Sequence, residues 1–466
     1  MGKLFEAIGN IFRIPELRRR VLFALAMLAV YRLGSFIPTP GINIVKWDEF
    51  FTRTQGSIFG FFDLFAGGNI RRLSIFALGI MPYITSSIIL QLLTVVVPTL
   101  EKLSKEGELG RRKITQWTRY LTVGLGIAQS FGIAIGLESM QDQIVIHPGI
   151  GFVLLTILSL TTGTAFIMWL GEQITERGIG NGMSLIIFTG IVVGIPNAIS
   201  NLYVNVFVTR EWSILTLIVV LVMMIAVVAF IVLVERAERR IPVQYAKRVI
   251  GRRVMGGQST HMPLKVNAGG VIPVIFASSI LAFPQTIASY PWVKANNWLS
   301  SILRSIQHGE PLYVLFFIAL IIFFCFFYIS IIFNPSEAAD NMRKYGGFIP
   351  GIRPGRSTSD YMNTILTRIT LVGACYLAIL CLIPDIMISG IHLQHLPLIG
   401  DAIDRVFPRF LLEGLNVQFY FGGTSLLIVV GVAMDTVNQV EAQLIMRHYE
   451  GFTPRAGRIR GRRSSA

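Results

Sequence analysis

Charged residues are scarce in this chain. Only 14% of its 466 residues are Asp, Glu, Lys or Arg, whereas 53% are hydrophobic, and the mean hydropathy is +0.63. Soluble domains carry about 25% charged residues. A composition this poor in charge excludes an ordinary soluble protein and indicates a chain that crosses a membrane several times.

Cysteine is scarce as well. Cys325, Cys375 and Cys381 all fall within apolar segments, and no two of them form a CxxC pair. His392 and His395 stand three residues apart in one loop, but two histidines do not make a metal site. We therefore expect neither a disulfide nor a bound metal ion.

Motifs for nucleotide chemistry are also missing. No GxxxxGK[ST] phosphate loop occurs, and the glycine-rich residues 178–182 form a short connection rather than a strand-to-helix turn. We expect no cofactor and no catalytic residue, so the chain is not predicted to be an enzyme. Any energy that its function needs has to come from a partner.

Ten long apolar segments define the expected architecture. Most of them reach the roughly 20 residues that a membrane-spanning helix needs. They are residues 21–39, 73–97, 120–138, 149–170, 183–199, 213–234, 268–288, 311–333, 369–389 and 417–434. The sequence thus predicts an all-α polytopic membrane protein with ten transmembrane helices.

The basic residues predict the orientation of these spans. If the N-terminus is cytoplasmic, the inner connections and tails carry 31 Lys and Arg residues and the outer connections carry 9, while Arg32 lies within the first span. Cytoplasmic loops hold the excess of positive charge. We therefore expect both termini in the cytoplasm.

The first 20 residues are expected to form a segment of their own. Apolar residues recur at helical spacing from Leu4 to Phe12, which predicts a short helix on the membrane surface, with a frayed tail as the alternative. The sequence FIPTP at residues 36–40 follows the first apolar run. It lacks the small residues of a cleavage site, so we expect the first span to be retained.

A short apolar segment, residues 57–68, follows the first span and ends in glycines. Residues 57–67 would form a helix of about 17 Å, against a hydrocarbon core of about 30 Å. Non-helical backbone at such depth survives only inside protein or beside a water-filled cavity. The segment is therefore predicted to be re-entrant and to lie near a pore or a central site.

The spans lack ionisable side chains at mid-depth, which ion-coupled transporters usually need there. Two helical stripes carry mild polarity instead. One runs through Ile80, Ile84 and Gln91, and the other through Ile275, Ser279 and Phe283. These stripes predict either ordinary helix packing or an apolar constriction that closes a pore by dewetting.

Two of the expected cytoplasmic loops, residues 235–267 and 334–368, are long and basic. Such loops either maintain the topology and contact anionic lipid, or bind RNA phosphates or an acidic partner. In the second loop, two Pro-Gly pairs bracket Arg353. Proline and glycine favour tight turns, so Arg353 is predicted to stand either on a rigid binding tip or on a solvated turn.

Five stretches of the chain resemble the bacterial SecY family, which forms the channel of the preprotein translocase. They lie in the right order and cover nearly the whole chain. They are residues 74–114, 176–188 with the sequence ERGIGNGMSLIIF, 245–281, 334–355 with NPSEAADNMRKYGGFIPGIRPG, and 419–435 with FYFGGTSLLIVVGVAMD.

The resemblance implies two inverted five-helix halves around an hourglass pore, residues 21–199 and 200–434, followed by a basic tail, residues 435–466. It also identifies residues 57–68 as the plug that fills the outer funnel. The expected pore ring comprises Ile80, Ile84, Met183, Ile187, Ile275 and Ile428, and the expected plug residues are Phe59, Phe61, Phe62 and Phe65 with Gly67 and Gly68 as hinges. Met183 stands where the family often has isoleucine.

A side opening for signal sequences and nascent polypeptides is implied beside Gln91, Ser279 and Phe283. The family implies that Arg353, Arg252 and Arg253 contact the SecA motor or the ribosome, and that SecE and SecG are membrane subunits of the complex. It also implies a location in the bacterial inner membrane. One departure from many relatives is a longer outer stretch, residues 390–416.

The sequence thus predicts a protein-conducting channel that passes secretory polypeptides across the membrane and releases membrane proteins sideways into lipid. Two alternatives stay open at this point. One is a secondary transporter for a small solute, which the lack of ionisable groups at mid-span disfavours. The other is a membrane scaffold that only anchors basic loops.

Overall fold

The computed structural model describes residues 14–53, 63, 66–139, 144–209, 214–245, 248–250, 253–255, 259–288, 303, 305–306, 310–389 and 423–450. The surface helix predicted within residues 1–20 falls mostly outside these ranges. So do the stretch 390–416 and most of the C-terminal tail. The side chains of residues 445–450 are also outside the description.

Each of the ten apolar segments overlaps a helix, so the α-helical polytopic architecture is confirmed. In chain order these helices are α2 (Pro15–Gly34), α5 (Met81–Val96), α7 (Glu108–Glu138), α8 (Ile150–Arg177), α9 (Gly182–Tyr203), α10 (Ile214–Arg236), α11 (Ile272–Ala288), α14 (Pro311–Ile332), α16 (Arg356–Ser389) and α19 (Gly423–Glu450). A π-helical turn, Val204–Val208, extends α9.

Seven helices among the described residues are long and apolar enough to span a membrane, or eight if α5 counts together with α6 (Pro98–Lys105). α6 bends away from α5 by 100°. Of the remaining two segments, α2 carries charged residues at both ends, and α11 is only 17 residues long. Most of the predicted spans, but not α2 and α11, therefore meet the length and composition of a membrane-spanning helix.

The second predicted span, residues 73–97, is helical only from Met81 onward, which leaves a helix of 16 residues. The preceding turns bury Leu73, Phe76 and Ile80. A helix of this length covers about 24 Å, which is less than the hydrocarbon core. Irregular backbone at this depth is tolerated because protein surrounds it.

One large hydrophobic cluster unites the helices of both predicted halves. It includes side chains from α2, α5, α8, α9, α10, α11, α14, α16 and α19. The two halves also meet where α5 contacts α11 and where α9 contacts α19. By contrast, α10 is lined with exposed side chains such as Ile218, Ile225 and Leu233, as expected for a helix that faces lipid.

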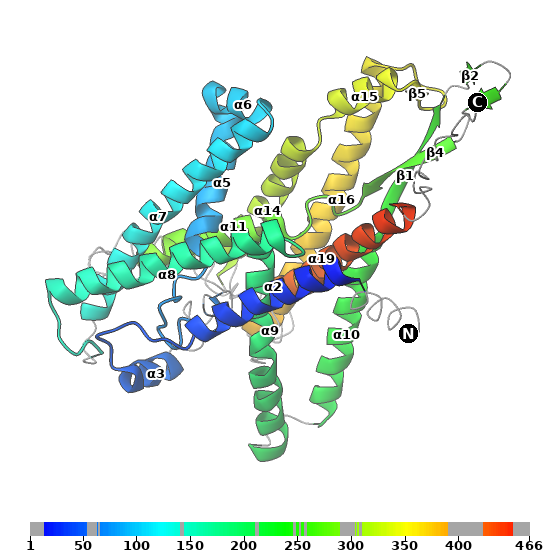
Figure 1. The fold of residues 1–466 in the computed structure, drawn as a ribbon. Coiled ribbons are helices and arrows are strands. Elements are labelled where there is room, and N and C mark those ends of the chain that lie inside the picture. The colour runs from blue at the N-terminus through cyan, green and yellow to red at the C-terminus, as the bar shows by residue number, and fades with distance from the viewer. Residues whose placement is uncertain are drawn as a thin grey trace, which may run out of the picture.

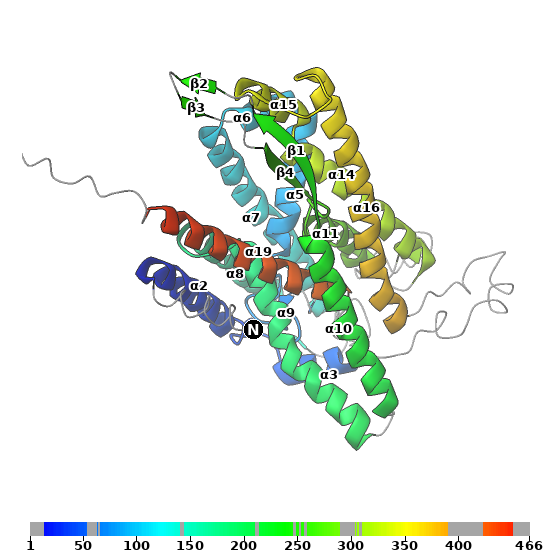
Figure 2. The same cartoon turned by 90° about the vertical axis from the view of Figure 1, so that its right-hand side faces the viewer.

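The connections lie at two opposite ends of the helical body. Figures 1 and 2 place α6 and α15 (Pro335–Lys344) at one end, together with the strands of the 235–267 loop. The amphipathic helix α3 (Ile44–Arg53) and the connection between α9 and α10 lie at the other end.

The loop of residues 235–267 contains β-structure, which the all-α prediction did not include. Strand β1 (Glu238–Tyr245) pairs antiparallel with β4 (Ser259–Lys265) and with the short β5 (Gly347–Phe348), in the order β4-β1-β5. Beyond it, β2 (Arg248–Ile250) pairs with β3 (Arg253–Met255). Ile241 and Val243 alternate with exposed residues along β1, which is the pattern of a half-buried strand.

Candidate functional site

The six residues of the predicted ring come together in the central hydrophobic cluster. Ile80 precedes α5, Ile84 lies on α5, Met183 and Ile187 lie on α9, Ile275 on α11 and Ile428 on α19. The five isoleucines are at most 8% exposed, and Met183 is partly buried against the cluster. These apolar side chains, which come from α5 and the residue before it, α9, α11 and α19, therefore belong to the same hydrophobic cluster or pack against it.

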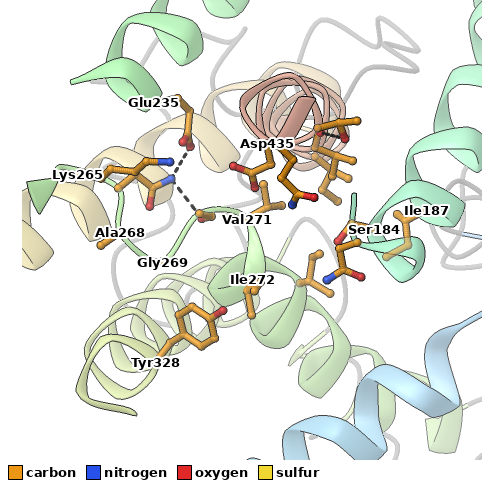
Figure 3. Close-up of a pocket in the computed structure, with 18 residues that line it drawn as sticks. Ser184, Ile187, Glu235, Lys265, Ala268, Gly269, Val271, Ile272, Tyr328 and Asp435 are labelled. Atoms are coloured by element: carbon orange, nitrogen blue, oxygen red, sulfur yellow. Dashed lines mark hydrogen bonds between the residues drawn. The ribbon is translucent and has the colours of Figure 1, made fainter. Parts of the chain in front are cut away.

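A cavity of about 250 Å³ lies beside this region, and Ile187, Ile275 and Ile428 form part of its lining. The rest of the lining is polar to a large extent (Figure 3). It includes Asn181, Ser184, Glu235, Lys265, Asn267, Asp435, Thr436 and Gln439. The cavity thus has a polar part, here termed the mouth, and an apolar part that includes three residues of the predicted ring.

Asn267 maintains the shape of this mouth. Its side-chain Nδ2 donates to Glu235 Oε1 at 2.6 Å and to the backbone oxygen of Gly270 at 3.2 Å (Figure 3). These bonds connect the end of α10 to the turn that leads into α11. Neither Asn267 nor Glu235 was predicted as a site residue from the sequence.

A hydrogen bond at the mouth also connects the two predicted halves. The backbone N–H of Gly180, in the connection between α8 and α9, donates to Gln439 Oε1 on α19 at 3.1 Å. Gln439 was not predicted as a site residue either. Its position on α19, eleven residues after Ile428, places it about three helical turns from the ring.

Met183 packs against a glycine. A Cβ atom on Gly171 of α8 would overlap the Sδ atom of Met183, and a Cβ on Gly182 would overlap the backbone oxygen of Gly171. Glycine therefore lets α8 and the start of α9 approach closely. The thioether is held in this contact, although methionine is a flexible side chain.

The seam between α5 and α11 is the predicted side opening. Gln91 on α5 is half-buried, and its Nε2 donates to Ser87 Oγ at 3.2 Å. Ser279 on α11 is buried, and its hydroxyl donates to the backbone oxygen of Ile275 at 2.7 Å. The backbone of Phe283 belongs to α11, but its side chain lies outside the described residues.

The predicted plug is described only at its C-terminal end. Phe59, Phe61, Phe62 and Phe65 lie outside the described residues, whereas Asp63 and residues 66–68 are included. Gly67 and Gly68 have φ angles of +72° and +80°, which favour glycine. A Cβ on Gly67 would also lie 2.6 Å from the Cα of Gly190 on α9, so this end of the segment contacts the helix that carries Ile187.

Asp63 connects the segment to the chain that follows it. Its Oδ1 accepts hydrogen bonds from the backbone N–H groups of Ile70 and Arg71, at 2.8 and 2.9 Å. Burial raises the pKa of Asp63 to about 6 from 3.8, although these bonds and the charges of Arg71 and Arg72 lower it. At neutral pH the carboxylate is therefore charged in a site that favours its protonated form.

We predict that acid stabilises this junction. Because the pKa of Asp63 is higher in the folded chain than in an exposed carboxyl, its contribution is greatest below pH 4 and is lost as pH rises through about 6. The contribution of Asp63 to the stability of the junction changes by at most about 3 kcal/mol between low and neutral pH. Resting ion conductance across a planar bilayer should fall as the pH is lowered from 7.5 to 5, and Asp63→Asn should reduce this dependence. The same pH response in Asp63→Asn and in the unaltered chain would contradict the assignment.

Arg353 lies in a turn between Gly351 and Gly355, a location that both readings of the Pro-Gly pairs share. Gly351 and Gly355 have φ angles of +81° and +108°, and Thr358 Oγ1 donates to the backbone oxygen of Arg353 at 2.9 Å. Beneath the tip, the buried Ile349 belongs to a small hydrophobic cluster with Ile241, Leu264, Met362 and Leu366. The arginine side chain is exposed, so a fixed backbone presents a free cationic group.

The other two predicted arginines are less well defined. Arg252 lies outside the described residues, and Arg253 is described only by its backbone at the start of β3. In Figure 2 the β2-β3 hairpin lies at the same end of the molecule as α15, which precedes the Arg353 tip. Within the described residues there is no group of three or more His, Cys, Asp or Glu side chains that could hold a metal ion.

Known proteins share both the sequence and the fold. A SecY family model matches residues 74–437. Protein translocase subunit SecY of Escherichia coli (strain K12) is 51% identical over 450 residues, which cover 95% of each chain.

Two solved structures share the architecture at lower sequence identity. One is a SecY protein whose plug domain is described as stabilising the closed state and maintaining a membrane seal. It is 16% identical, with a TM-score of 0.60, over 96% of this chain and 99% of that chain. The other is Sec61 in the canine ribosome-channel complex, with 16% identity, a TM-score of 0.56 and the same coverage. From the family match and the 51% identity, the chain belongs to the SecY family.

Proposed function

We propose that polypeptides pass through this chain at the ring formed by Ile80, Ile84, Met183, Ile187, Ile275 and Ile428. As a member of the SecY family the chain is a protein-conducting subunit of a translocase and not an enzyme. The observation that carries the proposal is the cavity, whose lining combines polar side chains with the ring residues Ile187, Ile275 and Ile428. An unfolded chain would enter from the polar mouth and displace the apolar contacts.

The short helices α5 and α11 support a lateral exit. They contact each other across the two halves, and neither is as long as the spans around them. A seam between short helices has less surface to separate than one between full-length spans, so it opens at lower cost. Gln91, Ser279 and Phe283 would then border the opening through which signal sequences and membrane segments reach lipid.

The end of the molecule with α6, α15 and the β-sheet is the cytoplasmic face in this proposal. The positive-inside rule supports it, because the connections at this end carry most of the basic residues. Arg353, Arg252 and Arg253 would bind a motor ATPase of the SecA type or the ribosome there. The solved relative in a ribosome-channel complex supports a ribosome as partner.

Further features of the family extend the proposal. The chain would lie in a bacterial inner membrane with SecE and SecG as membrane subunits and anionic lipids around its basic loops. Residues 21–199 and 200–434 would form the two halves. Residues 57–68 would plug the outer funnel between them.

The plug assignment leads to a direct experiment. Deleting residues 58–65 should raise the resting ion conductance of the purified complex in a planar bilayer, because water would reach the ring from the outer side. Removing eight residues from the stretch 390–416, which lies in another outer connection, provides a control of equal size. A resting conductance equal to that of the unaltered chain would leave residues 57–68 without a sealing role.

A further inference from the structure

The end of α2 is hydrogen-bonded to the C-terminal end of the proposed plug. The Tyr31 hydroxyl donates to the backbone oxygen of Ala66 at 3.2 Å, and Asn69 Nδ2 donates to that hydroxyl at 3.0 Å. Tyr31 is 3% exposed and Asn69 is fully buried. One phenol oxygen therefore connects α2 to both ends of a four-residue segment, residues 66–69.

Neighbouring groups support this connection. Arg32 Nη1 lies 3.4 Å from the backbone oxygen of Gly67 and donates to it. The Tyr31 ring stacks on Phe76, with centroids 5.9 Å apart and an interplanar angle of 12°. The ring of Tyr31 is thus fixed by apolar packing, while its hydroxyl is the part that binds residues 66–69.

The connection is also imperfect. Asn69 Oδ1 is buried and has no hydrogen-bond partner among the described residues. A buried polar atom without a partner costs free energy that contact with water would recover. Opening the segment would break the bonds of Tyr31 but would let water reach Asn69 Oδ1, so these two contributions oppose each other.

We propose that Tyr31 and Asn69 are positioning residues that form a latch on residues 66–69 and set how often the resting channel opens. This inference rests on the proposed function. The latch involves only one buried hydroxyl and one buried amide, and it lies at the junction where Gly67 contacts Gly190 of α9. Releasing it would free the end of the plug without altering the ring residues.

Tyr31→Phe tests the latch because it removes only the hydroxyl and keeps the aromatic stack. A lost buried hydrogen bond changes a closed-to-open ratio by roughly 5- to 30-fold. We expect the open probability in planar bilayers to rise by about that factor, while the unitary conductance stays the same. Tyr203→Phe, at an exposed tyrosine on α9, is the matched control and should behave as the unaltered chain.

A double-mutant cycle separates a latch from a general loss of stability. Asn69→Ala alone should also raise the open probability, and Tyr31→Phe should raise it by a smaller factor in that background than in the unaltered chain, because the two changes share the Asn69–Tyr31 bond and only the Tyr31–Ala66 bond is left to lose. Fully multiplicative effects would overturn the latch, as would an unchanged open probability in Tyr31→Phe. If the deletion of residues 58–65 raises the resting ion conductance and Tyr31→Phe does not, the latch is wrong and the plug assignment stands. If neither change raises the conductance, both proposals are wrong.

Discussion

Arg353→Glu should lower motor-driven protein export at least tenfold while the chain still folds and inserts. The side chain is exposed, and its backbone is held by turns at Gly351 and Gly355 above a buried cluster. Substitutions at such exposed positions usually change folding free energy by less than about 0.5 kcal/mol. Reversing a charge at a partner interface costs several kcal/mol, because like charges are then brought together.

The measurement is transport of a secretory protein into proteoliposomes with a purified motor and ATP. Arg356→Glu is the matched control, since Arg356 is also exposed and lies three residues further along the chain, at the start of α16. Resting ion conductance should be unchanged in both variants. Normal export by Arg353→Glu would show that the ordered tip is a solvated turn and not a docking element.

Ile275→Asn should open a leak through the resting channel. Ile275 is 8% exposed, belongs to the central hydrophobic cluster and also lines the polar cavity. Replacing it removes apolar contacts and places an amide in a dry site, at a cost of about 2–5 kcal/mol. Water entering from the cavity would hydrate the amide, so the variant favours a wetted constriction.

The long helices could be predicted from the sequence because apolar runs of about 20 residues have few other structures available in a membrane. The predicted ring residues belong to one hydrophobic cluster or pack against it. Their assignment to a ring came from the family resemblance and not from periodicity alone. The stripe through Ile80 and Ile84 was equally compatible with ordinary packing. In the structure, Ile187, Ile275 and Ile428 line the cavity, whereas Ile80 and Ile84 are buried in the hydrophobic cluster without lining it.

Other features could not be predicted, for identifiable physical reasons. Apolar composition alone does not reveal that residues 73–80 form turns, since buried turns and buried helix are equally hydrophobic. The sheet of β1, β4 and β5 was missed because its alternating pattern is short and contains Pro242, and because β5 pairs with β1 from about 100 residues further along the chain. The bonds of Tyr31 with Ala66 and Asn69 join positions 35 and 38 residues apart, and no local pattern encodes such a contact.

The most direct test of the proposed pore is the ion conductance of Ile275→Asn in planar bilayers without substrate. Ile225→Asn on α10 makes the same chemical change at a side chain that is 69% exposed, and Ile275→Leu keeps the site apolar. We expect a clear leak in Ile275→Asn, with sealed membranes for Ile225→Asn and Ile275→Leu. Equal conductance in Ile275→Asn and Ile225→Asn would contradict a pore that closes at Ile275.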